Sequence, residues 1–324
     1  MEKAALILPY FGSFDNLFPV FLNSCGKNSQ IDWLIFTDQH YAGQIPANVH
    51  FHHMTFAEMK KYIQRNYDFK ISLNSPYRLC NFKPAYGDIF SEYLTQFDYW
   101  GYCDCDLIWG NIGKYFAQYA GQYDRMGNFG HFTLLRNTDE INHLYRNKDA
   151  FKVAFSHDYS LFFDEIGFYK IFQASSFTCA PEPCLADFLP RHFNFHPVAR
   201  YEFMADLPWR QIFTWDNGTL RRWALANDTL VSTEVFYIHF LKRQMFVSDQ
   251  IMENSKWLIV PNKIIELSGP VSAQMVLEYS KPRFYYDYWR RGLTPSQIIK
   301  KLRQRFSLKR KNLMRQIEKT CTMQ

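Results

Sequence analysis

The sequence lacks the short motifs that mark several large protein classes. Its 324 residues contain no Walker A loop and no Gly-x-Gly-x-x-Gly fingerprint, which argues against a P-loop kinase or a dinucleotide-dependent dehydrogenase. The seven cysteines form no Cys-x-x-Cys pair, so neither a zinc module nor a disulfide scaffold is indicated, and a reducing compartment suits them. No apolar run reaches the roughly 18 residues of a membrane span, and the N-terminal run is too short for a signal peptide. We therefore expect a cytoplasmic protein.

Aromatic residues, in contrast, are abundant. Phe, Tyr and Trp make up 19% of the chain, a fraction that excludes a disordered protein. The length suffices for one large α/β domain that buries a full hydrophobic core.

The charge is uneven along the chain. The formal net charge is +6, but the positive charge is concentrated at the C-terminal end. From Arg290 onward the chain has eleven Lys or Arg and one acidic residue, Glu318, whereas the preceding residues are mildly acidic. Apolar residues recur in this tail at the helical spacings of four and seven, at Ile298, Leu302, Phe306, Leu313 and Ile317. Such a helix binds an anionic membrane surface, where each cation contributes about 1 kcal/mol. The alternatives are a helix packed on the body and a nucleic-acid tail; no nucleic-acid recognition motif is present, and we expect no nucleic-acid partner.

Apolar runs alternate with stretches of helical spacing over the first hundred residues. The expected strands are 4–8, 33–37, 49–53 and 99–105, and the expected helices are 14–23, 56–66 and 86–93. This alternation predicts an α/β fold with a mostly parallel sheet covered by helices on both faces. Ligands bind such sheets beyond the carboxyl ends of the strands, where Tyr10, Asp38, Asp104 and Asp106 fall. The aromatic-rich stretch of about 130–240 shows no clear pattern, and we assign it to the same domain.

Two carboxylates lie at the end of the last of these expected strands. In strand geometry Asp104 and Asp106 share one face, while Cys103 and Cys105 point to the core. Two ionised carboxylates about 4 Å apart repel by roughly 4 kcal/mol at an effective dielectric near 20, so a cation, a shared proton or solvent must compensate. Carboxylate oxygens favour Mg²⁺ or Mn²⁺ over zinc or copper. We expect a divalent-metal site here, with a solvated turn as the alternative.

Asp104-Cys105-Asp106 after an apolar strand resembles the Asp-x-Asp motif of nucleotide-sugar glycosyltransferases with the GT-A fold. With the stretches 80–87, 130–137 and 162–165 in this order, the chain is similar to a bacterial group that makes capsule, O-antigen of lipopolysaccharide and related surface polysaccharides. The resemblance covers roughly residues 4 to 250. It implies a Rossmann-like, mixed but mostly parallel sheet flanked by helices in one catalytic domain, 1–289, with a donor half of about 1–125 and an acceptor half of about 126–289. The basic helix, 290–324, would follow it.

The resemblance also implies how a donor is held. A Mn²⁺ or Mg²⁺ ion would bind the donor diphosphate, with Asp106 as a direct ligand and Asp104 on the metal, the ribose or both. GT-A enzymes often add a histidine from near the end of the domain, and His239 fits this role, with Lys242 or Arg243 meeting a phosphate. A buried core histidine is the alternative reading of His239.

Four further residues are candidates for contact with the nucleotide. Lys83 would place a charge on a phosphate, and Asn81 would bond the base or ribose. Asp38 follows the second strand, where GT-A proteins often contact the base or ribose, and Tyr10 lies in a loop that stacks on or wraps the base. A surface lysine and a helix-capping aspartate explain Lys83 and Asp38 equally well.

An inverting transferase needs a general base within reach of the acceptor hydroxyl. Asp164 and Glu165 stand where inverting GT-A enzymes often carry an acidic pair, and we do not rank them. An acidic pair at a helix N-terminus is the alternative, and His157 with Asp158 is a second candidate pair. A retaining mechanism would need no such base; we expect inversion.

The sequence thus predicts a metal-dependent hexosyltransferase. It would transfer a sugar from a nucleotide diphosphate donor, UDP-linked, to a lipid-linked saccharide during synthesis of a bacterial capsule or O-antigen. The basic tail predicts a peripheral location at the inner face of the plasma membrane. One alternative is a non-catalytic GT-A-like protein that binds glycan or scaffolds a membrane complex, and a weaker one is a metal-dependent nucleotidyltransferase.

Overall fold

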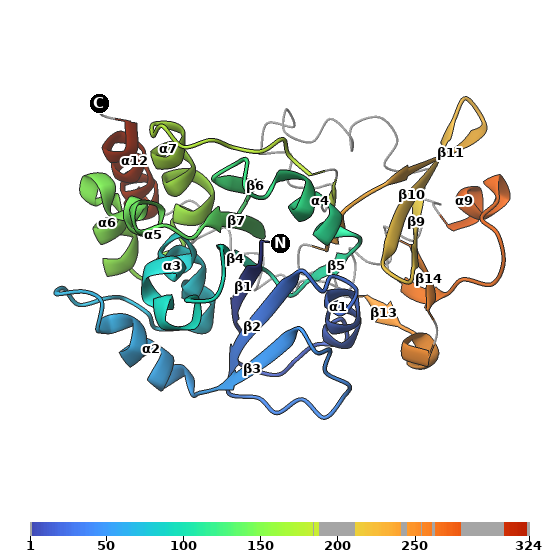
Figure 1. The fold of residues 1–324 in the computed structure, drawn as a ribbon, viewed down its shortest axis with the longest axis horizontal. Coiled ribbons are helices and arrows are strands. Elements are labelled where there is room, and N and C mark those ends of the chain that lie inside the picture. Colours follow the sequence, from blue (N-terminus) through green and yellow to red (C-terminus); the bar gives the residue numbers. More distant parts are fainter. Residues whose placement is uncertain are drawn as a thin grey trace.

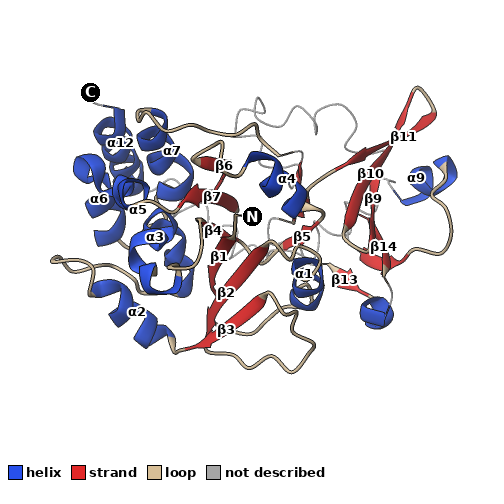
Figure 2. Ribbon diagram, viewed as in Figure 1, coloured by secondary structure: helices blue, strands red, loops and turns tan. Residues whose placement is uncertain are grey.

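The computed structural model describes residues 2–183, 185–187, 211–240, 245–253, 255–260, 263–279 and 308–322. Figures 1 and 2 show helices around a central sheet and a second group of strands at one end of the molecule. No helix in these ranges is both long and apolar enough to cross a bilayer.

The central sheet has six strands in the order β3-β2-β1-β4-β7-β6. The strands are β1 Ala4–Pro9, β2 Ile31–Thr37, β3 Val49–His53, β4 Tyr99–Cys103, β6 Arg125–Phe129 and β7 Phe132–Arg136. β3, β2, β1 and β4 pair in parallel, and β7 and β6 complete the sheet in antiparallel. The carboxyl ends of β1, β2 and β4 therefore meet at one edge of the sheet, which is where ligands bind in such folds.

Two hydrophobic cores cover the two faces of this sheet, because side chains alternate along each strand. In β1, Ala5 and Ile7 enter the larger core, whereas Ala4, Leu6 and Leu8 enter the other. The helices of the larger core are α2 Phe56–Gln64, α3 Tyr86–Ile89, α5 Asp139–His143, α6 Ala150–Ser156, α7 Phe168–Gln173 and α12 Leu308–Thr322. The opposite face is covered by α1 Phe18–Cys25 and α4 Ile112–Tyr119. The expected mixed α/β fold, with a sheet flanked by helices, is confirmed.

Short helical turns connect these elements. They are η1 Pro76–Ala85, η2 Ser91–Tyr93, η3 Leu144–Asp149, η4 Phe163–Gly167 and η6 Asp249–Glu253. Of the expected elements, the strands at 4–8, 33–37 and 49–53 and the helix at 56–66 are present with nearly the expected bounds. The strand expected to reach Cys105 ends at Cys103, so the two aspartates lie in the following loop.

A second six-stranded sheet, almost entirely antiparallel, departs from the expected alternation of strands and helices. Its order is β11-β10-β9-β14-β15-β13, and its strands are β9 Gln211–Asp216, β10 Thr219–Ala226, β11 Thr229–Glu234, β13 Phe246–Val247, β14 Lys256–Val260 and β15 Lys263–Glu266. Helix α9, Ala273–Tyr279, packs on β9 and β10. Two-residue turns with positive φ, Asn217-Gly218 and Asn227-Asp228, join β9 to β10 and β10 to β11. Such turns match the twist of antiparallel strands.

A three-stranded sheet in the order β5-β12-β8 links the two parts. Its strands are β5 Leu107–Trp109, β12 Tyr237–His239 and β8 Leu185–Asp187. β5 follows β4 directly in the chain, and β12 follows the antiparallel strands, so this small sheet brings distant parts of the sequence together.

The C-terminal helix α12 packs on the body. It contacts α6, α7 and η4, and Leu313, Ile317 and Cys321 are buried in the larger core. In this part of the tail the apolar stripe therefore faces inward, as the packing alternative predicts. Lys311, Arg315 and Lys319, four residues apart, are exposed. Ile298, Leu302 and Phe306 lie outside the described residues.

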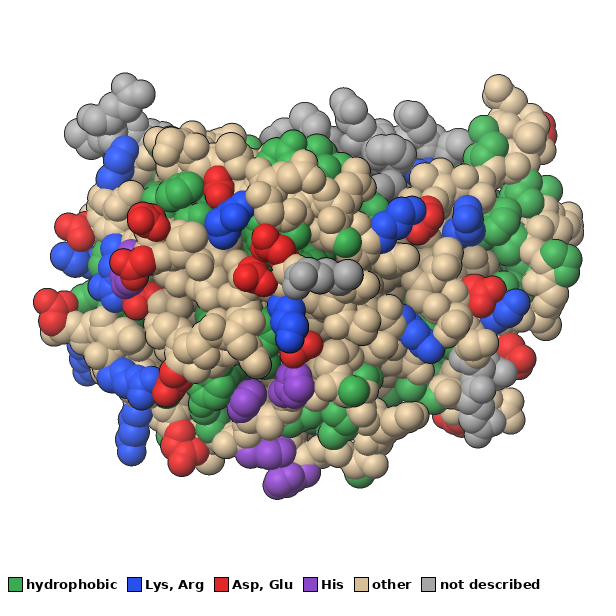
Figure 3. Space-filling model, viewed as in Figure 1, with side chains coloured by type: hydrophobic (Ala, Val, Ile, Leu, Met, Phe, Trp, Pro, Cys, Tyr) green, Lys and Arg blue, Asp and Glu red, His purple; other side chains and the backbone are tan. Residues whose placement is uncertain are grey.

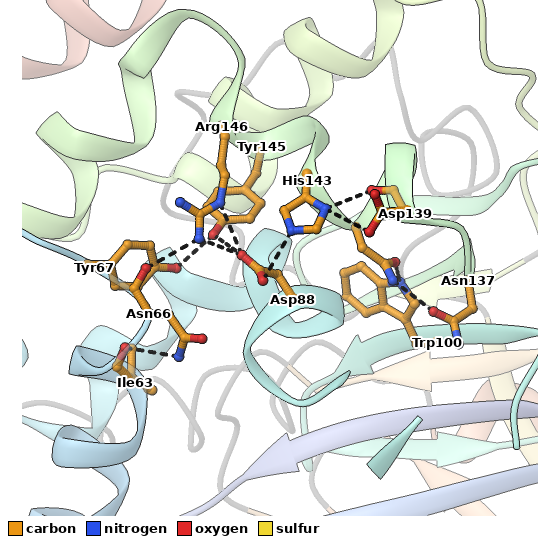
Figure 4. Close-up of polar contacts among 11 residues, drawn as sticks. Ile63, Asn66, Tyr67, Asp88, Trp100, Asn137, Asp139, His143, Tyr145 and Arg146 are labelled. Atoms are coloured by element: carbon orange, nitrogen blue, oxygen red, sulfur yellow. Dashed lines mark hydrogen bonds and ion pairs between the residues drawn. The ribbon is translucent and has the colours of Figure 1, made fainter. Parts of the chain in front are cut away.

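A polar network around Asp88 ties α3 to α2 and η3 (Figure 4). The Asp88 carboxylate accepts hydrogen bonds from the Tyr145 hydroxyl at 2.6 Å and from the Arg146 guanidinium at 2.7 and 3.1 Å. The Tyr145 hydroxyl also lies 3.1 Å from the Tyr67 hydroxyl, just beyond α2. The Asp88 side chain is only 14% exposed, so its charge depends on these donors.

We expect Asp88→Asn to lower the free energy of unfolding by about 2–4 kcal/mol, because it leaves a partly buried arginine without its anion. Chemical denaturation measures this loss. The control is Asp149→Asn, which removes an exposed ion pair with Lys152 and should change stability by less than about 1 kcal/mol. Equal effects of the two substitutions would contradict a structural role for the Asp88 network.

Candidate metal and acid–base site

Three side chains gather beyond the carboxyl end of β4. Nε2 of His239 lies 3.6 Å from Oδ1 of Asp106 and 4.0 Å from Oδ2 of Asp104, and one ligand atom from each residue lies within 4.8 Å of the others. Asp106 is 9% exposed and His239 is 4% exposed. Asp104 is more open, with 38% of its side chain exposed. The expected group of Asp104, Asp106 and His239 is thus brought together.

The backbone fixes this arrangement. β5 and β12 pair in antiparallel with Leu107 opposite His239, and the N–H of Phe240 donates to the carbonyl of Asp106 at 2.9 Å. On the other side, the N–H of Asp104 donates to the carbonyl of His131 at 3.1 Å. The loop that carries the two carboxylates is therefore held at both of its ends by strand neighbours.

His131 lies behind His239. It occupies the two-residue turn between β6 and β7, and its ring stacks on the His239 ring with centroids 4.0 Å apart. Nε2 of His131 lies 3.2 Å from the Tyr237 hydroxyl. Burial lowers the pKa of His131 well below its ordinary value, and the neighbouring His239 and Lys83 lower it further. A neutral His131 thus adds no positive charge beside a candidate metal ligand.

Lys83 lies at the centre of the candidate site. Its ammonium donates to Oδ1 of Asp104 and to the carbonyl of Gly130, both at 2.6 Å, and lies 4.0 Å from Oδ2 of Asp164. Burial opposes the charge of this ammonium, but Asp104 and Asp164 outweigh it and raise the pKa of Lys83 well above its ordinary value. Lys83 is therefore an internal cation between two carboxylates rather than a surface lysine.

The expected acidic pair lies on η4, next to Lys83. Asp164 is 4% exposed, whereas Glu165 is exposed. Burial raises the pKa of Asp164 to about 7, against the opposing charge of Lys83. Gly130 packs so closely that a Cβ there would lie 2.9 Å from Oδ2 of Asp164 and 2.8 Å from Oε1 of Glu165. The turn before β7 can approach the acidic pair only because residue 130 has no side chain.

The raised pKa of Asp164 predicts a pH dependence of stability in metal-free buffer. Between about pH 4 and pH 7 the folded chain keeps a proton on Asp164 that the unfolded chain has released. This contribution to the free energy of unfolding is therefore fully present below about pH 4, decreases as the pH rises, and is lost above about pH 7. Thermal melts at pH 5 and pH 8 should show that the melting temperature of Asp164→Asn, relative to that of the native chain, is higher at pH 8 than at pH 5. A constant difference would contradict the assignment.

The side chains fit a hard divalent cation. Two carboxylates and one imidazole make a donor set that suits Mn²⁺ or Mg²⁺, and all three face one another. Within the described ranges no other group of three or more His, Cys, Asp or Glu side chains has this geometry. Figure 3 shows histidines gathered on one face, over the region where Figure 1 places β2 and β3. These histidines belong to no such group.

Two further expected residues lie at the adjoining strand ends. Tyr10 follows β1, and burial raises its pKa to about 12, helped by the nearby acidic groups of Cys105, Asp15 and Asp106. Asp38 follows β2 and is exposed; its Oδ1 accepts from the N–H of Gly12 at 3.2 Å. Tyr10 therefore borders the aspartate loop, and Asp38 holds the loop that contains Gly12.

Asn81, expected to contact the nucleotide, is not in the site. It is fully buried and donates to the carbonyls of Ala154 and Tyr159, while its side-chain oxygen accepts from the N–H of Leu161. It joins η1 to the segment that precedes Asp164 and is a structural residue.

The second candidate pair is also structural in its contacts. Asp158 accepts from the side chains of Ser72 and Asn74, and Nδ1 of His157 lies 2.9 Å from the carbonyl of Val153. The structure does not bring this pair to Lys83 or Asp104. Lys242 and Arg243 lie outside the described residues.

Sequence reasoning did not single out His131 and Gly130 as members of the site. Both belong to the stretch 130–137, and a glycine just before the apolar run 132–135 is a usable signal for a turn. Nothing local, however, indicates that this turn faces both Asp164 and His239.

The comparison with known proteins gives a family without a function. A family model described as a family of unknown function (DUF6625) matches residues 6–268. No curated protein sequence matches the chain. The match contains every described member of the candidate site, from Tyr10 to His239, and ends before α12. The chain is therefore a member of the DUF6625 family, whose function is unknown.

Proposed function

We propose that this chain is a metal-dependent glycosyltransferase that takes a sugar from a UDP-linked donor. The observation that carries the proposal is the meeting of Asp104, Asp106 and His239 beside a buried acid, Asp164, at the carboxyl edge of the sheet. A metal site and an adjacent acid–base group are the two parts that an inverting transferase of this type needs. The acceptor in this proposal is a lipid-linked saccharide of a bacterial capsule or O-antigen.

The donor diphosphate would lie against the carboxylate loop. A divalent ion held by Asp104, Asp106 and His239 would neutralise the charge that grows on the leaving diphosphate as the glycosidic bond breaks. Lys83, already within 2.6 Å of Asp104, adds a fixed positive charge from the protein itself. Tyr10 and Asp38, at the neighbouring strand ends, would contact the nucleoside.

Asp164 is the better candidate for the general base. With a pKa of about 7, the Asp164 carboxylate can accept a proton near neutral pH and hold it. A general base is most efficient when its pKa lies near the pH at which the enzyme works. Lys83 lies 4.0 Å from the carboxylate and limits the rise of this pKa. Glu165 is exposed beside it and is the less constrained partner. The proposed step is direct displacement, with Asp164 taking the acceptor hydroxyl proton and the anomeric configuration inverted.

The first experiment is a thermal-shift assay with UDP, GDP and CMP, each with and without Mn²⁺. A ligand at 100 times its dissociation constant adds about 2.7 kcal/mol to the free energy of unfolding. We expect a shift with UDP that requires Mn²⁺. No shift with any pair would overturn the metal–nucleotide site.

Turnover separates an enzyme from a binding protein on the same fold. With a UDP-sugar and Mn²⁺, a transferase should release UDP slowly even without an acceptor, and Asp106→Asn should abolish that release. A Mn²⁺-dependent shift without any UDP release, with or without lipid-linked saccharides, would favour the non-catalytic glycan-binding alternative.

We further propose that the protein acts peripherally at the inner face of the plasma membrane. Support comes from α12, whose apolar residues Leu313 and Ile317 are buried while Lys311, Arg315 and Lys319 are exposed. This helix would lie on an anionic surface through its charges, without inserting an apolar face.

Replacing Lys311, Arg315 and Lys319 together by Gln should weaken binding to phosphatidylglycerol vesicles by about 100-fold, at about 1 kcal/mol per cation. Co-sedimentation at low salt measures the binding, which should vanish with purely zwitterionic vesicles. A matched control removes three exposed lysines of the body: Lys61, Lys70 and Lys114. An equal loss in the control would show that net charge, rather than α12, determines binding.

A further inference from the structure

The segment that carries Asp164 has an irregular backbone. Phe162, just before it, adopts a left-handed conformation with φ of 51°, which is strained for a bulky residue. The carbonyl of Phe162 accepts from the N–H groups of Glu165 and Ile166, and η4 then forms a single π-turn. Such turns recur at functional sites and persist only where the surrounding structure holds them.

Packing from two sides holds this segment. On the sheet side, the buried guanidinium of Arg125 lies 5.6 Å from the Phe168 ring and 5.2 Å from the Phe172 ring in the helix that follows. On the outer side, Ile317 of α12 packs against Gly167, where a Cβ would lie 3.2 Å from its Cγ2. Ile317 is 1% exposed, so this contact is part of the core.

Ile317, which packs on Gly167, comes from far along the chain. Gly167 is three positions from Asp164, whereas Ile317 lies in a helix beyond the residues that match the family model. Leu313 and Cys321, one turn to either side of Ile317, are buried in the same core. The helix is therefore docked along its length, and Ile317 packs on the segment that carries the acidic pair.

We infer that α12 is a positioning element of the active site, in which Ile317 braces η4 and so holds Asp164 against Lys83. This inference rests on the proposed transferase function. It assigns the C-terminal tail an inward role in catalysis, in addition to any contact that its outer face makes with a membrane.

The test compares Ile317→Ala, Ile317→Val and Gln316→Ala, since Gln316 is the exposed neighbour on the same helix. In donor turnover, Ile317→Ala should lower kcat by about 10- to 100-fold, as for a small displacement of a catalytic group, with an unchanged KM for the donor and unchanged Mn²⁺ dependence. Ile317→Val should restore most of kcat, and Gln316→Ala should match the native chain. Assays are made well below the melting temperature of each variant.

Hydrogen–deuterium exchange provides a readout that does not require activity. Amides of residues 162–168 should exchange faster in Ile317→Ala than in Gln316→Ala, while those of 104–110 stay unchanged. Unchanged exchange at 162–168, or kcat and KM that change together, would overturn the bracing role. If exchange at 162–168 responds as expected but the native chain releases no UDP, the proposed transferase function fails. The packing of Ile317 on η4 would then have a structural role only.

Discussion

Asp106→Asn is expected to abolish the Mn²⁺-dependent stabilisation by UDP and to reduce donor turnover by at least about 100-fold. Loss of a residue that merely supports a metal ligand costs 10- to 100-fold in affinity or activity, and Asp106 is itself a proposed ligand, 3.6 Å from His239. The substitution keeps the size of the side chain and removes only its charge. Calorimetric titration with Mn²⁺ and an assay of UDP release measure the two effects.

Asp68→Asn is the matched control, because Asp68 is exposed and lies outside the site. It should leave both Mn²⁺ binding and turnover unchanged. Native-like Mn²⁺ affinity in Asp106→Asn would remove the carboxylate loop from the proposed mechanism.

The second large effect is expected for Asp164→Asn. Removing a general base lowers kcat by about 10²- to 10⁴-fold, while Mn²⁺ and UDP should still bind, because Asp164 is not one of the proposed ligands. In the native chain, kcat should fall as the pH drops below about 7, since Asp164 becomes protonated and cannot accept the proton of the acceptor. The Asn variant should lack this acid limb.

Glu165→Gln discriminates between the two members of the acidic pair. Because Glu165 is exposed and Asp164 is buried beside Lys83, we expect Glu165→Gln to lower kcat by less than about 10-fold. A large loss in Glu165→Gln with a small loss in Asp164→Asn would reverse the assignment of the base.

The first half of the fold was predictable because its signals are local. Short apolar runs that end at Pro9 and Asp38 correspond to β1 and β2, and the carboxylates were predicted at the end of the strand that forms β4, although that strand stops at Cys103. All three residues of the candidate metal group were named from the sequence, but His239 was included on a family resemblance rather than on a pattern in the sequence. The register of β5 with β12, which places His239 beside Asp106, has no local signal.

The antiparallel second sheet was missed although a signal for it was present. Asn217-Gly218 and Asn227-Asp228 lie between apolar runs, and Asn-Gly is a strong indication of a two-residue hairpin turn. The aromatic content of these runs obscured their alternation. Here the turn residues were more informative than the hydrophobic pattern.

The roles of polar residues in η1 were not predictable from position alone. Asn81 and Lys83 are two positions apart, yet Asn81 bonds backbone groups of the 154–161 segment while Lys83 lies between Asp104 and Asp164. Which of them faces the site depends on packing against segments about 20 and about 70 to 80 positions later in the chain. Tertiary contacts, not local propensity, decide such cases.

The Lys83–Asp104 pair has a consequence for how the proposed metal would be bound. In small zinc domains the cation is needed for folding, because the site does not exist in the unfolded chain and the free energy of metal binding drives folding. In this chain Lys83 already neutralises one carboxylate and ties the aspartate loop to the turn at Gly130. On the proposed function, folding and metal loading would therefore be separate events: the chain would complete its fold with Lys83 as an internal cation, and a folded protein would take up the ion afterwards.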